Sequence, residues 1–137
     1  MNIILATAAA LAFFTGLVHS VLGEFTVFAR MRQGHLVPTN GGTVFKPFHV
    51  RILWASWHVA TVFGWFAAAT LLVLASKPVP AEVRLFLLVA VSAAMLSGSL
   101  LVLYGTKGRH PGWVAMLLVV ILSILGIGAQ QFAPSAA

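Results

Sequence analysis

The third apolar stretch of the chain contains seven hydrophobic residues in a row, Leu85-Phe86-Leu87-Leu88-Val89-Ala90-Val91. This run does not alternate between apolar and polar residues, so it does not predict a strand of a transmembrane β-barrel. A continuous apolar run inside a longer apolar stretch is typical of a buried or membrane-spanning helix. The segment therefore predicts an α-helix, and its surroundings decide whether that helix crosses a membrane.

The whole chain has the composition of an integral membrane protein. Of its 137 residues, 61% are hydrophobic and only 7% are charged, whereas soluble domains carry about 25% charged residues. Four apolar stretches have the length of about 20 residues with which a helix crosses a bilayer. We expect these spans at residues 3–28, 52–76, 83–104 and 111–132.

Short turns join the second span to the third and the third to the fourth. Lys77-Pro78-Val79-Pro80 forms the first turn, and the second runs from Gly105 to Pro111. Glycine suits the end of one helix, and proline suits the first turn of the next. Short connections make neighbouring helices antiparallel. The sequence therefore predicts an all-α integral membrane protein, an antiparallel up-down four-helix transmembrane bundle that forms a single domain over residues 1–137.

Basic residues are distributed unevenly between the two predicted sides of the membrane. The loop 29–51 and the turn 105–110 together carry six Lys or Arg residues, and the opposite side carries Lys77 and Arg84. By the positive-inside rule, we expect a cytoplasmic loop, both termini outside, and a location in the cytoplasmic (inner) membrane of a bacterium. The net charge of +6 thus reflects topology and does not indicate a nucleic-acid-binding domain.

Two histidines lie inside apolar spans at similar predicted depths. His19 lies nine residues before the end of the first span, and His58 lies six residues after the start of the second. At a rise of 1.5 Å per residue, these positions are about 13 Å and about 9 Å from the same membrane face. An ionisable group at such a depth is costly, so both residues mark a candidate functional site.

The neighbours of the two histidines suggest which helix faces point inward. His58 shares a helical stripe with Trp54 and other polar or indole-bearing residues, Arg51, Thr61 and Trp65. On the first span, His19 shares a face with small residues that include Gly16 and Gly23, and small residues let a helix or a flat ligand approach closely. We therefore expect both faces to point into the bundle.

Imidazoles from two helices at one depth are the axial ligands that haem b takes in helical bundles. The candidate cofactor-binding residues are His19, His58, Gly16, Gly23 and Trp54. A divalent metal such as zinc is a second candidate ligand for His19 and His58, with Glu24 or His110 completing the set. The alternative is that both histidines are neutral and hydrogen-bonded within the protein, and the sequence leaves the cofactor unknown.

Glu24 is the carboxylate nearest to the interior of a predicted span. It lies about 140° around the helix from His19, so these two residues do not form a ligand pair on one face. We expect Glu24 to meet Arg51, Arg109 or His110, which come from the same side of the membrane, in a salt bridge or an anion-binding cluster. A lone carboxylate in a span also fits a small proton-coupled transporter.

Three segments, His19–Glu24, Arg51–Val62 and Gly108–Trp113, resemble a recurring pattern in short bacterial four-span inner-membrane proteins that have no assigned activity. The resemblance covers most of the chain and implies a location, but no reaction. We expect a non-enzymatic accessory or partner-binding subunit, embedded in the lipid bilayer and part of a larger membrane-protein complex or a homo-oligomer. The alternatives are a haem- or metal-binding protein and a proton-coupled transporter.

Overall fold

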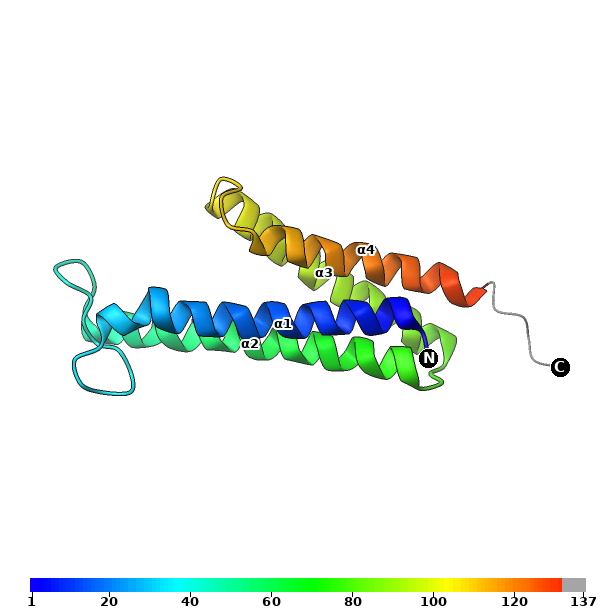
Figure 1. Cartoon of the computed structure of the whole chain (residues 1–137), viewed down its shortest axis with the longest axis horizontal. Helices are drawn as coiled ribbons and strands as arrows, with labels where there is room; N and C mark the ends of the chain where they lie inside the picture. Colours follow the sequence, from blue (N-terminus) through cyan, green and yellow to red (C-terminus); the bar gives the residue numbers. More distant parts are fainter. Residues whose placement is uncertain (132–137) are drawn as a thin grey trace. The chain divides into compact units, whose positions relative to one another are not determined.

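The chain is all-helical in the computed structural model, which describes residues 1–131 (Figure 1). Its four α-helices over these residues are α1 (Ile3–Thr26), α2 (Pro47–Ser76), α3 (Ala81–Gly105) and α4 (Gly112–Gln131). Helices α1, α2 and α3 are long and apolar enough to cross a membrane, and the apolar part of α4, Gly112–Gly128, is shorter. The all-helical class and four helices at the predicted places are confirmed, whereas their arrangement as a membrane bundle stays a prediction.

The largest difference from the predicted spans is at the start of α2. This helix begins at Pro47, whereas the sequence predicted a span from residue 52. The charge of Arg51 breaks the apolar run, but a charged side chain does not prevent helical backbone bonds, and proline is well suited to the first helical turn. The last residue of the predicted fourth span, Phe132, lies outside the described residues.

The chain divides into two compact units. One contains residues 1–15 together with the chain from residue 65 onward, and the other contains residues 16–64. We refer to the first as the four-helix unit and to the second as the hairpin unit.

The core of the four-helix unit takes residues from all four helices. Its buried members are Leu5, Ala8, Ala9 and Ala12 of α1, Ala68, Leu71, Leu74 and Ala75 of α2, Leu88 and Val91 of α3, and Val119 of α4. Alanine side chains let helix backbones come close, and close packing drives helix association where the solvent is itself apolar. Helices α3 and α4 pack against each other, and the Ser99 hydroxyl donates a hydrogen bond to the Trp113 carbonyl at 2.8 Å.

Asn2 ties the beginning of α1 to two other helices of the four-helix unit. Its Oδ1 atom accepts a hydrogen bond from the Leu5 N–H at 3.1 Å, which caps the helix. Its Nδ2 atom donates to the Gly126 carbonyl at 2.9 Å, and its backbone N–H donates to the Ala75 carbonyl at 2.8 Å. This buried amide therefore fixes α1 against both α2 and α4.

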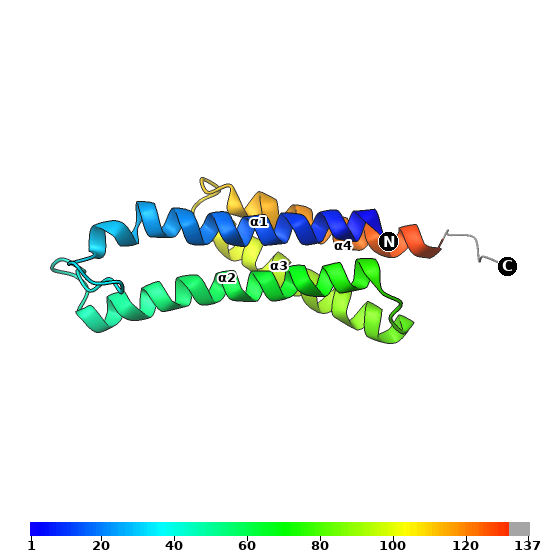
Figure 2. The same cartoon turned by 60° about the horizontal axis from the view of Figure 1, so that its bottom comes forward.

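The hairpin unit consists of the second half of α1, the first half of α2 and the connection between them. The connection, drawn in cyan, folds at one end of this hairpin (Figures 1 and 2). It begins with a short 3-10 helix, η1 (Phe28–Met31), whose last carbonyl accepts hydrogen bonds from the N–H groups of Thr39 and Asn40 at 3.0 and 2.9 Å. Phe28, Pro38 and Val50 are fully buried. The predicted loop 29–51 is therefore a folded segment that includes buried side chains.

Candidate functional site

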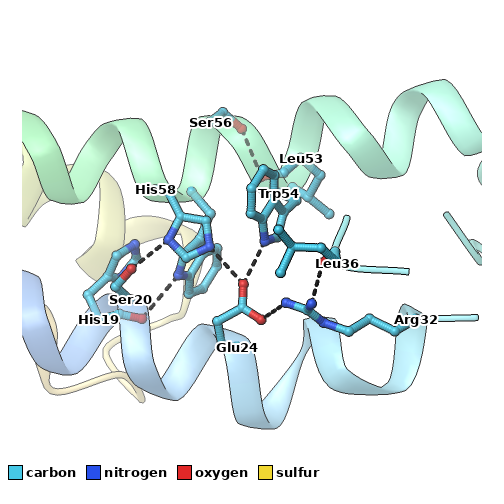
Figure 3. A network of polar contacts seen from close by, with 10 residues as sticks. His19, Ser20, Glu24, Arg32, Leu36, Leu53, Trp54, Ser56 and His58 are labelled. Atoms are coloured by element: carbon cyan, nitrogen blue, oxygen red, sulfur yellow. Dashed lines mark hydrogen bonds and ion pairs between the residues drawn. The ribbon is translucent and has the colours of Figure 1, made fainter. Parts of the chain in front are cut away.

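Glu24 is the centre of a polar cluster in the hairpin unit (Figure 3). It lies in the last turn of α1, and its carboxylate accepts hydrogen bonds from three side chains. The Oε1 atom accepts from the Trp54 indole N–H at 2.6 Å and lies 2.9 Å from Nε2 of His58. The Oε2 atom forms an ion pair with the guanidinium of Arg32. The carboxylate thus joins α1 to α2 and to the connection between them.

His58 contacts the protein through both ring nitrogens. Its Nδ1 atom lies 2.5 Å from the hydroxyl of Ser20, and its Nε2 atom lies 2.9 Å from Glu24. Ser20 and Glu24 are four residues apart on α1, so they lie on the same face of that helix. A neutral imidazole with its proton on Nε2 satisfies both contacts, because Nδ1 then accepts from the serine hydroxyl and Nε2 donates to the carboxylate.

Arg32 connects the cluster to the segment after η1. Its guanidinium donates both to Glu24 and to the backbone carbonyl of Leu36. The side chains of Arg32 and Glu24 are 25% and 28% exposed, so the pair lies at the edge of the hairpin unit and not deep within it. Because Arg32 bridges a helix and a loop, the ion pair determines where the loop runs.

Next to the cluster, His19 and Trp57 form a stacked pair. Their ring centroids are 4.3 Å apart with an angle of 8° between the planes, and the Trp57 indole N–H donates to the His19 carbonyl at 3.0 Å. The buried ring of Phe28 packs edge-on against Trp57. Gly23 faces this indole so closely that a Cβ atom would overlap with Nε1 of Trp57. Close approach at the Gly23 face, which the sequence predicted, is therefore present.

The other residues of the predicted site are Gly16, Arg51, Arg109 and His110. Gly16 is buried in α1, and Arg51 is exposed on the first turns of α2. Instead of Arg51, Glu24 takes Arg32 as its cationic partner. Arg109 and His110 belong to the four-helix unit, and their part in a common site stays a prediction. The His110 ring accepts a hydrogen bond from the Gly112 N–H at 3.0 Å, which caps the start of α4.

Three residues in or next to the cluster were not among the predicted site residues. Ser20 had a signal in the sequence, since it lies one helical turn before Glu24. Trp57 lies beside the predicted stripe of α2, and its contact with α1 depends on how the two helices are rotated. The contact of Arg32 with Glu24 could not be predicted from the sequence, because the path of the segment after η1 follows no periodic pattern. Ser20 contacts His58, Arg32 contacts Glu24, and Trp57 stacks on His19.

The chemistry open to the cluster follows from its contacts. Ser20, His58 and Glu24 are linked in the order of a nucleophile, a base and an acid. However, Ser20 lies inside α1, where neighbouring N–H groups make helical hydrogen bonds and offer no oxyanion hole. The part of the chain from residue 1 to residue 131 also holds no group of three His, Asp or Glu side chains placed as metal ligands. A role in orienting helices and in holding a proton fits the geometry better than acyl transfer.

No protein-family model, no curated protein and no solved structure matches this chain. The functional argument therefore depends on the residues and their geometry.

Proposed function

We propose that this chain is a non-enzymatic multi-pass protein of a bacterial cytoplasmic membrane, and that it acts as an accessory or partner-binding subunit. In this proposal the Glu24 cluster is structural. It holds the connection 27–46 in one conformation at the end of the hairpin unit, so that a larger membrane-protein complex or a second copy of the chain meets a preformed surface.

The observation that carries the proposal is the set of donors around Glu24. Trp54 and His58 lie one turn apart on α2, Arg32 lies in the connection after η1, and all three donate to this one carboxylate. A carboxylate near an apolar environment is costly unless it is paired and hydrogen-bonded. Because all of these partners belong to the hairpin unit, Glu24 stabilises the fold of that unit.

The distribution of charge supports the orientation with both termini outside. Six Lys or Arg residues lie in the segments 29–51 and 105–110, which an up-down bundle would have on one side of the membrane. The other side would have Lys77 and Arg84. Basic residues near the ends of spans stay in the cytoplasm during insertion. The ordered connection 27–46 is then presented to cytoplasmic or membrane-bound partners.

Co-purification under mild detergent tests the accessory role. A tagged chain should migrate with a constant partner, or as a defined homo-oligomer, at a size above that of the monomer with its micelle. The Glu24→Gln variant should lose this association while it still inserts into the membrane, whereas Glu82→Gln, at the exposed first turn of α3, should keep it. A wild-type chain that is always monomeric and without a partner would contradict the proposal.

A small proton-coupled transporter is the second candidate function. The observation that favours it is the contact between Glu24 and His58, since two groups that exchange protons share one hydrogen bond. Proteoliposomes with an imposed proton gradient should then take up substrate, and Glu24→Gln should abolish this uptake. Haem or metal ligation by His19 and His58 is the remaining alternative, but it requires His58 to give up its contact with Ser20 or with Glu24.

A further inference from the structure

An open groove lies on the hairpin unit, outside the Glu24 cluster. It has a volume of about 460 Å³ and is lined by His35, Leu36, Val37, Thr39 and Arg51. One wall is the segment 35–39, and the other is the first turns of α2, where Arg51 is exposed. The groove therefore combines a guanidinium and an imidazole with two aliphatic side chains.

The wall formed by residues 35–39 is held by hydrogen bonds from both sides. Arg32 donates to the carbonyl of Leu36, and the Thr39 N–H donates to the carbonyl of Met31 at 3.0 Å. Pro38, in the middle of this wall, is fully buried. This wall of the groove is thus preorganised, which lowers the entropic cost of binding a ligand.

The charge of the hairpin unit favours an anion in this groove. Residues 16–64 contain the basic residues Arg30, Arg32, Lys46 and Arg51 and a single carboxylate side chain, Glu24. Since Glu24 is paired with Arg32, the net positive charge belongs to the other three residues. All three are exposed, and Arg51 lines the groove itself.

Apolar side chains are exposed on the same unit, and one of them, Leu36, lines the groove. Leu36, Val44 and Phe48 are 77%, 77% and 67% exposed, and Phe48 lies three residues before Arg51 on α2. Exposed apolar side chains do not stabilise a free anion in water. They can contact a phospholipid, which carries its phosphate next to apolar acyl chains. Clusters of basic residues beside a span attract the anionic lipids of the cytoplasmic leaflet, and aromatic side chains favour the membrane interface.

We infer that the groove binds the phosphate of an anionic phospholipid, with the Arg51 guanidinium as the cationic contact and the His35 imidazole as a second hydrogen-bond donor. Arginine suits this role because its planar guanidinium donates two parallel hydrogen bonds to a phosphate. Leu36 and Val37 then contact the glycerol and the upper part of the acyl chains. This inference depends on the membrane location but not on the accessory role, so either one can fail without the other.

The experiment measures the lipid that stays bound to the full-length protein after purification. The chain is reconstituted in nanodiscs of phosphatidylcholine with phosphatidylglycerol, extracted in mild detergent, and analysed by native mass spectrometry. Retained phosphatidylglycerol should exceed phosphatidylcholine, and Arg51→Gln should lower it about fivefold, the effect of about one basic residue at a membrane surface. His35→Gln should lower it less.

Arg30→Gln is the matched control, because Arg30 is an exposed basic residue of the same unit that does not line the groove. It should leave lipid retention near the wild-type level, and tryptophan fluorescence should show that all variants are folded. Equal losses for Arg30→Gln and Arg51→Gln would overturn the inference in favour of a general positive surface. Displacement of the lipid by millimolar inorganic phosphate would overturn it in favour of a free-anion site.

Discussion

His58 reaches from α2 to two residues of α1 that lie one turn apart. Its Nε2 atom is 2.9 Å from Oε1 of Glu24, and its Nδ1 atom is 2.5 Å from the Ser20 hydroxyl. One imidazole therefore sets both the rotation and the longitudinal register of the two helices within the hairpin unit. Apolar packing alone does not specify such a register, because aliphatic faces tolerate sliding by a turn more readily than directed hydrogen bonds do.

Replacing the central carboxylate should destabilise the protein. Glu24→Gln keeps the size of the side chain, but it removes the charge and points an amide N–H₂ group or a weaker acceptor at Arg32. We expect the free energy of unfolding to fall by about 2 kcal/mol, the typical value of hydrogen bonds to charged groups. Thermal unfolding in detergent, followed by tryptophan fluorescence, measures the change in Tm. Glu82→Gln serves as the control, and an equal effect of both substitutions would refute a special role for Glu24.

Substitution by alanine at two helical glycines of the hairpin unit should change the stability of the protein in opposite directions. At Gly23 a Cβ atom would overlap with the Trp57 indole, whereas at Gly64 no atom lies within 4 Å of the added carbon. Gly23→Ala should therefore cost about 1–3 kcal/mol through overpacking. Gly64→Ala should gain up to about 1 kcal/mol through helix propensity. The same unfolding assay compares the two variants, and Gly23→Leu should be more severe still. Similar Tm values for Gly23→Ala and the wild type would mean that Trp57 does not pack on this face.

Loss of Arg32 should loosen the connection after η1 without unfolding the helices. In Arg32→Gln the link from Glu24 to the Leu36 carbonyl is absent, so the segment 33–46 should open more often. A loss of about 1.4 kcal/mol in local stability gives about tenfold faster cleavage when proteolysis tracks the open state. Chymotrypsin is suitable because it cleaves after Leu36 and Phe45 and its sites are unchanged. Arg30→Gln should be cleaved at the wild-type rate, and faster cleavage of both variants would point to a general charge effect.

An absorption spectrum separates the structural histidines from ligating ones. If His58 serves Ser20 and Glu24, the purified protein should show no Soret band before or after dithionite, and elemental analysis should find no stoichiometric metal. A Soret band that shifts on reduction and disappears in His58→Leu or His19→Leu would instead make these residues haem ligands. The spectrum and the elemental analysis should be made on the same detergent-purified sample.

The orientation can be tested by cysteine labelling, because the chain contains no cysteine. Gln33→Cys and Ser76→Cys each place a thiol at an exposed position without altering a charge. With both termini outside, an impermeant maleimide added to intact cells should label Cys at 76 but not Cys at 33, and permeabilised cells should label both. The reverse pattern would place the connection between α1 and α2 outside, and would contradict the positive-inside assignment.

The helices could be predicted well because apolar length is a local property of the sequence. The predicted spans and the observed helices agree at most ends, and the exception is at α2, where Arg51 breaks the apolar run but not the backbone. The site could be predicted in part. Glu24 and His58 were candidates because ionisable residues in apolar helices are unusual. Trp54 was a candidate because it shares the helical stripe of His58, and Gly23 because small residues let another helix or a ligand approach closely. Their mutual contacts were not predictable, since Glu24 was expected to meet Arg51, Arg109 or His110.

By itself, the sequence determined that this chain is made of apolar helices and that ionisable residues such as His19, Glu24 and His58 lie in them. Both facts follow from composition and from spacing along one helix. Only the tertiary structure decided that Arg32 pairs with Glu24, that Ser20 faces His58 and that Trp57 lies on Gly23. These contacts depend on the rotation of α1 against α2 in the hairpin unit and on the path of the connection between them, and neither follows a sequence period. The pairing of Arg32 with Glu24 has a further reason, because a carboxylate beside apolar helices is costly unless it is paired and hydrogen-bonded.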